Sequence, residues 1–232
     1  MTDLLFDLPE TPSIVVRGET ARYPVRRVFC VGRNYEAHAT EMGNVVDREA
    51  PFYFTKSPAH LIHSGATLPY PPGTENLHHE MELFFTIGSP VHHASKEEAV
   101  GAIHAYGAAL DMTRRDLQDT AKDKRRPWDL SKDFEGSVVV GPLTPASDVG
   151  EIGPQRISLA VNGETRQDAT LSLLIHSCTD IVTHLSRFYH LAPGDVILTG
   201  TPAGVGAVGP GDRLSGTIDG LAPVELTIGP AD

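Results

Sequence analysis

The chain is short of cysteine, of long apolar runs and of positive charge, and each shortage disfavours a class of protein. Its 232 residues include only two cysteines, Cys30 and Cys178. They are expected to be reduced core residues rather than part of a disulfide-rich secreted scaffold, although a single bridge between them stays open. No apolar run approaches the roughly 20 residues that cross a bilayer, and the N-terminus lacks the basic-then-apolar order of a secretory signal. We therefore expect a cytoplasmic protein with no membrane partner.

The shortage of positive charge also bears on partners. Lys and Arg total 19 against 30 Asp and Glu, which gives a formal net charge of −11. Nucleic acids and anionic membranes select for clustered Lys and Arg, so neither is an expected partner. A local basic pocket remains compatible with this overall balance.

The remaining composition is typical of a folded protein rich in turns and strands. Hydrophobic residues make up 40% and charged residues 21%, with 22 Gly and 18 Pro, a balance unlike that of a disordered or fibrous chain. The sequence contains no internal repeat and no long linker. We therefore predict an irregular, Pro-rich segment over residues 1–22 and a single domain over residues 23–232. Helical and strand patterns do not alternate regularly, which favours an α+β fold over a doubly wound parallel sheet.

Hydrophobic periodicity and turn residues place the expected elements. Asn34 is a predicted helix cap, and Ser95 with Glu98 forms a predicted capping box. Asn162-Gly163 predicts a tight hairpin turn, because this dipeptide tolerates the positive φ angles that such a turn requires. Strands are predicted over 25–32, 51–56, 77–88, 107–112, 137–141, 157–162, 195–200 and 224–228, and helices over 34–43, 95–106, 113–124 and 171–188.

Two acidic residues, Glu80 and Glu82, stand on one predicted strand. Alternate side chains of a strand share a face, so these carboxylates would lie side by side, with His78 one step behind. Like charges so placed repel each other unless a cation lies between them, and Mg²⁺, Mn²⁺ or Ca²⁺ suits oxygen ligands. The alternative is a half-solvated strand with two surface glutamates.

A third carboxylate, Asp111, ends another predicted buried strand and needs a partner there. If it joins Glu80 and Glu82, three carboxylates leave about three of the six octahedral positions of Mg²⁺ or Mn²⁺ for water and substrate. Those positions would allow chelation of a substrate with adjacent oxygens and stabilisation of an enolate. Lys132 and Arg115 would add positive charge to this site, or would simply be solvated.

His38 and Glu41 are three residues apart on the predicted helix over 34–43 and would be neighbours. A carboxylate beside an imidazole orients the ring and stabilises its protonated form, as a general base requires. The alternative is an incidental surface pair. For His78 and His79 the sequence leaves three roles open: metal ligand, hydrogen-bond donor to a metal ligand, or neither.

Residues 204–209 match the G-x-G-x-x-G pattern of dinucleotide-binding proteins. In those proteins the glycines open a helix whose N-terminus receives the pyrophosphate. Here Pro210-Gly211 follows at once and leaves no room for such a helix. We therefore predict that this loop binds neither NAD nor FAD.

Several motifs occur together, in order, as they do in one family of enzymes. The sequence resembles the fumarylacetoacetate hydrolase family over most of its length. The resemblance rests on Val31-Gly32-Arg33-Asn34-Tyr35 with His38 and Glu41, on His79-Glu80-Met81-Glu82-Leu83, on residues 110–118, on Pro127-Trp128 with Lys132, and on residues 198–206.

This resemblance implies a mixed β-sandwich roll of the C-terminal-domain type of that family, usually a homodimer. It implies a metal site for Mg²⁺ or Mn²⁺, with Ca²⁺ as a substitute, held by Glu80, Glu82 and Asp111. It also implies a catalytic base at His38 assisted by Glu41.

The remaining site residues implied by the resemblance surround this centre. Lys132 would be the cationic stabiliser of an oxyanion, and the substrate-contacting positions would be Arg115, Gln118, Thr201 and Lys56.

The implied activity is hydrolysis of a carbon–carbon bond in a small-molecule 2,4-dioxo acid. The variants at residues 114–118 and 126–129 most resemble members that convert fumarylpyruvate to fumarate and pyruvate in bacterial gentisate degradation, close to the acylpyruvases. Asn34 stands where members that cleave fumarylacetoacetate carry a metal-binding aspartate, which favours smaller pyruvate-containing substrates. The alternatives are an oxaloacetate decarboxylase or enol–keto isomerase of the same family, and a non-catalytic metal-binding protein.

Overall fold

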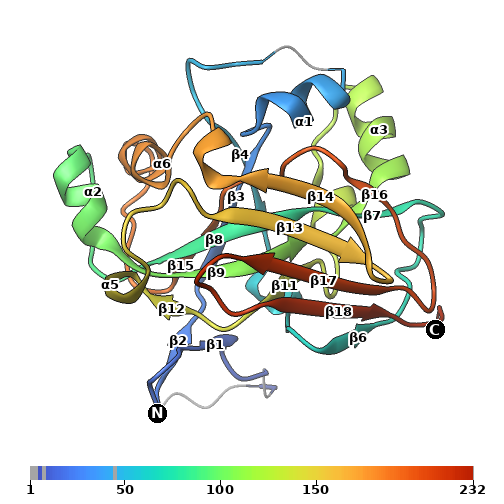
Figure 1. Cartoon of the computed structure of the whole chain (residues 1–232), viewed down its shortest axis with the longest axis horizontal. Helices are drawn as coiled ribbons and strands as arrows, with labels where there is room; N and C mark the ends of the chain where they lie inside the picture. The colour runs from blue at the N-terminus through green and yellow to red at the C-terminus, as the bar shows by residue number, and fades with distance from the viewer. Residues whose placement is uncertain (1–4, 7–8, 44–45, 232) are drawn as a thin grey trace.

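Two β-sheets packed face to face form the centre of the molecule (Figure 1). The structure is a computed structural model that describes residues 5–6, 9–43 and 46–231. The larger sheet has the order β4 (Phe52–Lys56), β3 (Arg27–Gly32), β15 (Asp195–Leu198), β8 (Met81–Ile87), β9 (Ile103–Asp111), β11 (Val138–Val140) and β5 (Leu61–His63), and β12 (Thr144–Pro145) also pairs with β9. Its pairings are both parallel and antiparallel, so the predicted α+β class and mixed sandwich are confirmed.

The smaller sheet covers one face of the larger one (Figure 1). Its order is β14 (Glu164–Thr170), β13 (Arg156–Val161), β17 (Arg213–Ile218), β18 (Val224–Ile228) and β6 (Ala66–Leu68). The predicted hairpin joins β13 to β14, with φ angles of 53° at Asn162 and 81° at Gly163. Both angles are positive, as a two-residue turn between twisted strands requires.

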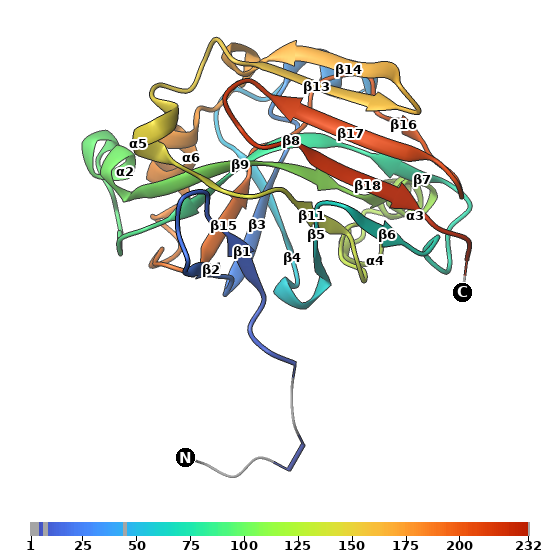
Figure 2. The same cartoon turned by 60° about the horizontal axis from the view of Figure 1, so that its bottom comes forward.

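The larger sheet is buried on both faces, which explains the continuous apolar runs in its strands. Leu83 and Phe85 of β8 belong to the core between the sheets, whereas Phe84 belongs to a second core on the other face. Two N-terminal strands, β1 (Ser13–Val15) and β2 (Arg22–Pro24), contribute to that second core and pair with each other (Figure 2). The prediction that residues 1–22 are irregular is therefore wrong for Ser13–Val15.

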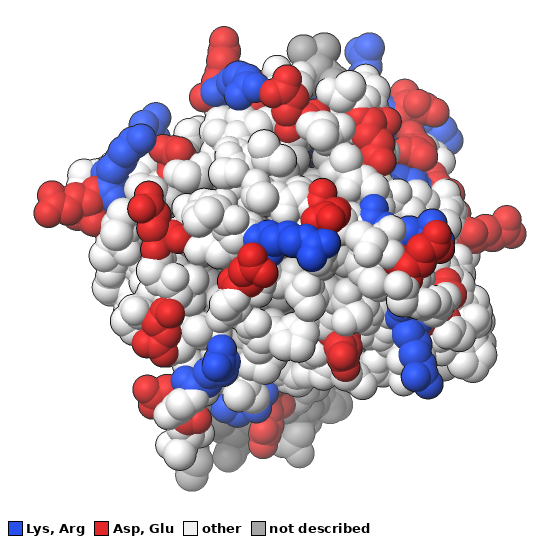
Figure 3. Space-filling model, in the orientation of Figure 1, with Lys and Arg blue, Asp and Glu red and all other residues white. Residues whose placement is uncertain are grey.

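Short helices and a small sheet flank the two large sheets (Figure 1). On the surface seen in Figure 3, positive and negative side chains are interspersed and neither sign forms a broad patch. Within the described residues, no helix combines the length and the apolar character that a membrane crossing needs. The helices are α1 (Glu36–Glu41), α2 (Lys96–Ala102), α3 (Arg115–Asp123), α4 (Asp129–Lys132), α5 (Ala146–Val149) and α6 (Cys178–Leu185), the 3₁₀ turns are η1 (Pro58–His60) and η2 (Leu171–Leu173), and the small sheet has the order β10 (Thr113–Arg114), β7 (Leu77–His79) and β16 (Gly206–Ala207).

The helix predicted over 95–106 is too long. Its capping box between Ser95 and Glu98 is present, but the helix ends at Ala102, and Ile103 already begins β9. Pairing of β9 with β8 supplies the backbone of this segment with hydrogen-bond partners in the extended form. Val100, placed on the apolar stripe by periodicity, is 60% exposed.

The helix predicted over 171–188 is also largely wrong. Leu171–Leu173 forms a single 3₁₀ turn, and Leu174 is extended. The α-helix begins only after Ser177, whose side chain and that of Asp180 form a reciprocal capping box. The helix ends at Leu185, and Phe188 is 66% exposed.

The helix after Asn34 does not have the predicted cap. Tyr35 is the N-cap of α1 and makes no capping bond. The Asn34 amide instead donates to the carbonyls of His176 and Thr199 and accepts from the backbone N–H of His176. Asn34 therefore joins three segments and does not start a helix.

Two other predictions hold. Cys30 and Cys178 are free and buried. The glycine-rich loop over 204–209 contributes β16, which pairs with β7, and opens no helix. Its backbone is therefore unsuited to the pyrophosphate-binding role that its pattern alone would indicate.

Candidate metal and catalytic site

The three carboxylates predicted to converge do so. Glu80, Glu82 and Asp111 are buried, and each places one oxygen within 4.8 Å of the others. Glu80 lies at the break between β7 and β8, Glu82 lies within β8, and Asp111 ends β9. The antiparallel register pairs Met81 with Leu110, and the N–H of Asp111 donates to the Glu80 carbonyl at 2.9 Å. Strand pairing therefore places the three side chains together.

Two buried cations contact this acidic cluster from the direction of the cavity. Lys132 Nζ lies 2.7 Å from Glu80 Oε2 and 2.8 Å from Asp111 Oδ2, and it donates to Thr113 Oγ1 at 2.7 Å. Arg115 Nη2 lies 2.5 Å from Glu80 Oε1. The positive charge predicted at these two positions is therefore held against the carboxylates and not solvated.

Lys56 lies behind Asp111 and does not line the cavity that the carboxylates face. Its Nζ is 2.8 Å from Asp111 Oδ1 and also donates to the carbonyls of Met112, Ser137 and Lys132. Its side chain is fully buried. The structure therefore does not place Lys56 where a substrate would contact it, contrary to the expectation from the sequence.

The electrostatics of the cluster distinguish Glu82 from Glu80. Burial by itself would raise the pKa of Glu80, but Lys132 and Arg115 more than offset this effect and lower it. Burial raises the pKa of Glu82 well above its usual range, and Asp111 and Glu80 raise it further. Burial would lower the pKa of Lys132, but Asp111 and Glu80 more than offset that effect and raise it. Glu80 is therefore held ionised, whereas Glu82 needs additional positive charge.

The donor set fits a hard divalent cation. Within the described residues no Lys, Arg or His forms an ion pair with Glu82, whose Oε2 accepts only the backbone N–H of Gly200, at 2.7 Å. Asp111 Oδ1, although close to Lys56, accepts no hydrogen bond of good geometry. Three buried carboxylates converge at one cavity, and one of them lacks a cation partner among the described residues. Mg²⁺ and Mn²⁺ prefer such carboxylate ligands.

His38 and Glu41 lie on α1, and His38 lines the same cavity. His38 Nδ1 is 3.3 Å from Glu41 Oε2, and the backbone N–H of Gly204 donates to both oxygens of Glu41, at 3.1 and 3.2 Å. Burial lowers the pKa of His38, partly offset by Glu80 and by Glu41. The imidazole is therefore neutral at neutral pH and able to accept a proton, with Glu41 held in place to orient it.

The cavity that joins these groups measures about 30 Å³. Arg115, Gln118 and Thr201, predicted to contact the substrate, line it together with His38 and the carboxylates. Arg115 Nη1 donates to Gln118 Oε1 at 2.5 Å, which fixes the guanidinium between Gln118 and Glu80.

One residue that supports the site was missed from the sequence. Gln167 of β14 is fully buried, and its Oε1 lies 3.1 Å from His79 Nδ1 and accepts from the N–H of Met81 at 3.0 Å. Its Nε2 donates to Thr201 Oγ1 at 2.7 Å and to the Pro202 carbonyl at 2.8 Å. Hydrogen bonds of Gln167 therefore connect the strand segment beside Glu80 to Thr201.

No local pattern distinguishes Gln167, because it follows charged residues on a strand whose other side faces solvent. The two histidines near Glu80 are both engaged elsewhere. His79 contacts Gln167, and His78 lies 2.9 Å from Asn76 Oδ1. Neither belongs to the group of side chains within the described residues that is arranged to hold a metal ion.

Comparison with known proteins agrees with this geometry. The family model described as "Fumarylacetoacetate (FAA) hydrolase C-terminal" matches residues 27–229. A fumarylpyruvate hydrolase of a Ralstonia species is 49% identical over 193 residues, which are 82% of this chain and 100% of that protein. An oxaloacetate tautomerase of Escherichia coli strain K12 is 40% identical over 205 residues, 88% of this chain and 93% of that protein.

A solved structure extends the comparison to three dimensions. The fumarylpyruvate hydrolase from Pseudomonas aeruginosa, crystallised in complex with Mn²⁺ and pyruvate, matches with a TM-score of 0.94 and 44% sequence identity. The match covers 98% of this chain and 100% of the other.

Proposed function

The chain belongs to the fumarylacetoacetate hydrolase family, matched over its C-terminal domain model, and from this membership we propose that it is a metal-dependent hydrolase that cleaves fumarylpyruvate into fumarate and pyruvate. The observation that carries the proposal is the buried group of Glu80, Glu82 and Asp111 facing a neutral histidine. Similarity to the Ralstonia and Pseudomonas hydrolases along their whole lengths supports the choice of substrate.

We propose that Glu80, Glu82 and Asp111 hold Mg²⁺ or Mn²⁺. The Mn²⁺ complex of the Pseudomonas relative supports this choice, and so does the donor set of this chain. When bound, such an ion acts as a Lewis acid that polarises the oxygens of a 2-oxo acid. Lys56 has a supporting role in this scheme, because its contact with Asp111 fixes that carboxylate from behind.

His38 is the proposed general base. It takes a proton from water, whose oxygen forms a bond to the 4-carbonyl carbon of the substrate. Glu41, beside Nδ1 of His38, stabilises the imidazolium that results. Its own position is fixed by the backbone N–H of Gly204.

Collapse of the hydrated carbonyl breaks the bond between carbons 3 and 4, and the electron pair leaves with the pyruvate fragment. A carbanion is a poor leaving group, so fixed positive charge must stabilise it. Lys132 is the proposed source, because its ammonium lines the cavity and is already held by Glu80 and Asp111. The proton held by His38 then neutralises the fragment. Arg115, Gln118 and Thr201 are the proposed contacts that orient the substrate.

A second candidate is an oxaloacetate enol–keto tautomerase. The relative from Escherichia coli, 40% identical, supports it. The same residues would serve, but His38 would move a proton on carbon and no water would attack.

A substrate panel separates these functions. Fumarylpyruvate, acetylpyruvate and oxaloacetate are each assayed with Mn²⁺ and with EDTA. We expect EDTA-sensitive release of pyruvate from fumarylpyruvate. Tautomerisation of oxaloacetate alone would favour the second candidate, release of CO₂ from it would indicate a decarboxylase, and no turnover of any substrate would favour a non-catalytic metal-binding protein.

We further propose that the protein is a cytoplasmic homodimer that acts in the breakdown of aromatic compounds. The family resemblance supports the dimer and the pathway, and the composition supports the compartment. Light scattering coupled to size-exclusion chromatography tests the dimer directly, against a monomer of 25.0 kDa.

A further inference from the structure

A larger groove of about 520 Å³ adjoins the carboxylate cavity. The two share Arg33, Phe54, Lys122, Trp128 and Lys132 as lining residues, so they lie next to each other. The Nζ of Lys132 lies 5.0 Å from the centre of the Phe54 ring, at the junction between them. The groove is therefore the neighbouring space that the far end of a longer substrate would face.

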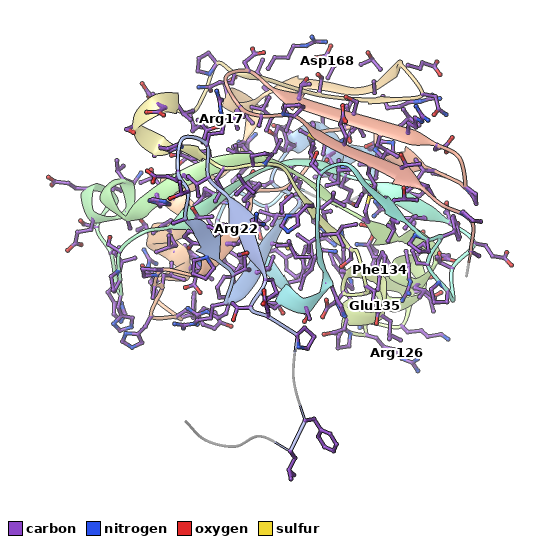
Figure 4. The ribbon with its side chains drawn as sticks, turned by 90° about the horizontal axis from the view of Figure 1, so that it is seen from below. Arg17, Arg22, Arg126, Phe134, Glu135 and Asp168 are labelled. Atoms are coloured by element: carbon purple, nitrogen blue, oxygen red, sulfur yellow. The ribbon has the colours of Figure 1, made fainter. Side chains whose placement is uncertain are left out.

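The groove is lined with positive charge in a protein of net charge −11. Besides Lys132, which is already paired, it presents Arg33, Lys122, Arg125 and Arg126, and Asp129 is the one acidic residue among its described lining residues. Figure 4 shows Arg126 on the same side of the molecule as Phe134 and Glu135, which follow α4. Such a local reversal of sign attracts anions and would be unfavourable without one.

Most of these cations lack a carboxylate partner of their own. Among the described side chains, none forms an ion pair with Arg33, Arg125 or Arg126, and Lys122 has only Asp119 at 3.5 Å. Burial lowers the pKa of Lys122, and Arg115 and Arg33 lower it further. The arrangement therefore has positive charge in excess of its anions.

Aromatic rings hold two of the cations at one place. The guanidinium of Arg33 lies 5.8 Å from the ring centres of Phe52 and of Trp128, and the ammonium of Lys122 lies 5.7 Å from the ring of Trp128. Both heads thus contact the same indole, whose face stabilises positive charge without neutralising it. Their N–H groups remain available to an anion.

The backbone at Arg33 has a conformation that is uncommon outside glycine. The same conformation at Arg125 closes the C-terminus of α3, where the N–H of Arg126 donates to the carbonyl of Ala121 at 2.8 Å. Within the described residues, four that are not glycine have positive φ, and two of them, Arg33 at 60° and Arg125 at 52°, line this groove. A side chain other than glycine is disfavoured in this region, and such residues concentrate at functional sites.

We propose that this groove binds a carboxylate at the far end of the acyl group of the substrate, with Arg33 and Lys122 as the residues that determine specificity. The inference rests on the proposed hydrolysis of a 2,4-dioxo acid. It adds that the preferred acyl group is flat and anionic, lies against Trp128 and Phe54, and ends between the two cations. An acyl group that ends in a methyl leaves the groove without its counter-ion.

The test compares fumarylpyruvate, which carries the second carboxylate, with acetylpyruvate, which does not. We compare kcat/KM for fumarylpyruvate with kcat/KM for acetylpyruvate as a ratio. Lys122→Met and Arg33→Met should each lower this ratio by on the order of tenfold, mainly by raising KM for fumarylpyruvate, because each variant loses a charge-assisted contact. Lys124→Met is the matched control, since Lys124 is exposed on the same segment and outside the groove, and should leave the ratio unchanged.

The two proposals fail in different ways. If the wild-type protein hydrolyses neither substrate, the proposed function is wrong. If it hydrolyses fumarylpyruvate and both variants keep the wild-type ratio, the carboxylate site is wrong and the hydrolase stands. Fumarate and its monocarboxylate analogue crotonate are also compared as competitive inhibitors. Their inhibition constants measure binding to the groove independently of the turnover of either inhibitor. The preference for fumarate should be lost in both variants, and retention of that preference would also overturn the site.

Discussion

The ammonium of Lys132 lies 2.7 Å from the carboxylate of Glu80, and both side chains are buried. The pair joins α4 to the break between β7 and β8, two segments far apart in the sequence. Each residue keeps the other ionised, since Lys132 lowers the pKa of Glu80 and Glu80 raises that of Lys132. A fixed cation and a fixed anion thus stand at the edge of the cavity before any substrate arrives.

Removal of Lys132 should affect the chemistry, whereas removal of Lys56 should affect mainly stability. For Lys132→Met we expect kcat to fall about 10²- to 10³-fold, the effect of losing one preorganised electrostatic contact. Lys56→Met removes a partner of Asp111 outside the cavity, so it should cost about 3–5 kcal/mol of unfolding free energy. Steady-state kinetics and urea unfolding of both variants measure the two effects. A Lys132→Met enzyme with kcat within threefold of wild type would contradict the role of Lys132.

Glu82 should control metal affinity. It has no ion-pair partner among the described side chains, so its charge is the one a metal ion would neutralise. Saturating Mn²⁺ at 100 times its Kd should stabilise the wild-type fold by about 2.7 kcal/mol, and Glu82→Gln should lose most of this gain. Thermal unfolding with and without Mn²⁺, together with calorimetric titration, provides the measurement.

Glu225→Gln serves as the control for this experiment, because Glu225 is exposed on β18 and remote from the cluster. It should respond to Mn²⁺ as the wild type does. Equal stabilisation of all three proteins would show that Glu82 does not bind the ion.

The acidic limb of the pH–rate profile should follow the protonation of His38. A general base acts only when deprotonated, so activity should fall as the pH drops through its pKa, which burial places below the ordinary value of 6.5. Glu41 raises the pKa of His38. Glu41→Gln should therefore move the acidic limb of kcat/KM to lower pH while reducing kcat.

Glu36→Gln is the matched control for Glu41, because Glu36 lies on the same helix and pairs with Arg48 at the surface. It should leave the acidic limb where the wild type has it. A shift of the Glu41→Gln limb to higher pH would rule out the assigned contact between Glu41 and His38.

Gln167 should act through Thr201. Gln167→Met keeps the length of the side chain but leaves His79, the N–H of Met81 and the hydroxyl of Thr201 each without one partner. Unsatisfied buried polar groups cost about 1–3 kcal/mol each, so a lower melting temperature is expected along with a higher KM.

A double-mutant cycle distinguishes positioning from general destabilisation. If Gln167 positions Thr201, the effects on kcat/KM of Gln167→Met and Thr201→Val should be less than additive in the double variant. Full additivity would show that Gln167 only supports the fold.

Local patterns predicted those parts of the structure that depend on neighbours in the sequence. Alternation along a strand placed Glu80 and Glu82 together, helical spacing placed His38 beside Glu41, and Asn162-Gly163 specified its turn. These features depend on backbone geometry over a few residues, which the sequence determines directly.

Some features could not be predicted because they depend on residues distant in the sequence. The apolar pattern placed Ile103 in a helix, but Ile103 belongs to β9, because it pairs with β8. Lys56 lies outside the cavity because β4 places its side chain behind Asp111. Gln167 carries no local signal, since its partners come from β7, β8 and residues 201–202.

The sequence by itself determined the chemistry available to this protein: three carboxylates suited to a hard cation, a histidine with its acid, and a core able to bury them. Only the tertiary structure decided which cation faces which carboxylate, and that a groove with excess positive charge adjoins them. The physical reason is that charge pairing and burial depend on distances between side chains, and strand register and packing set those distances between residues that are remote along the chain.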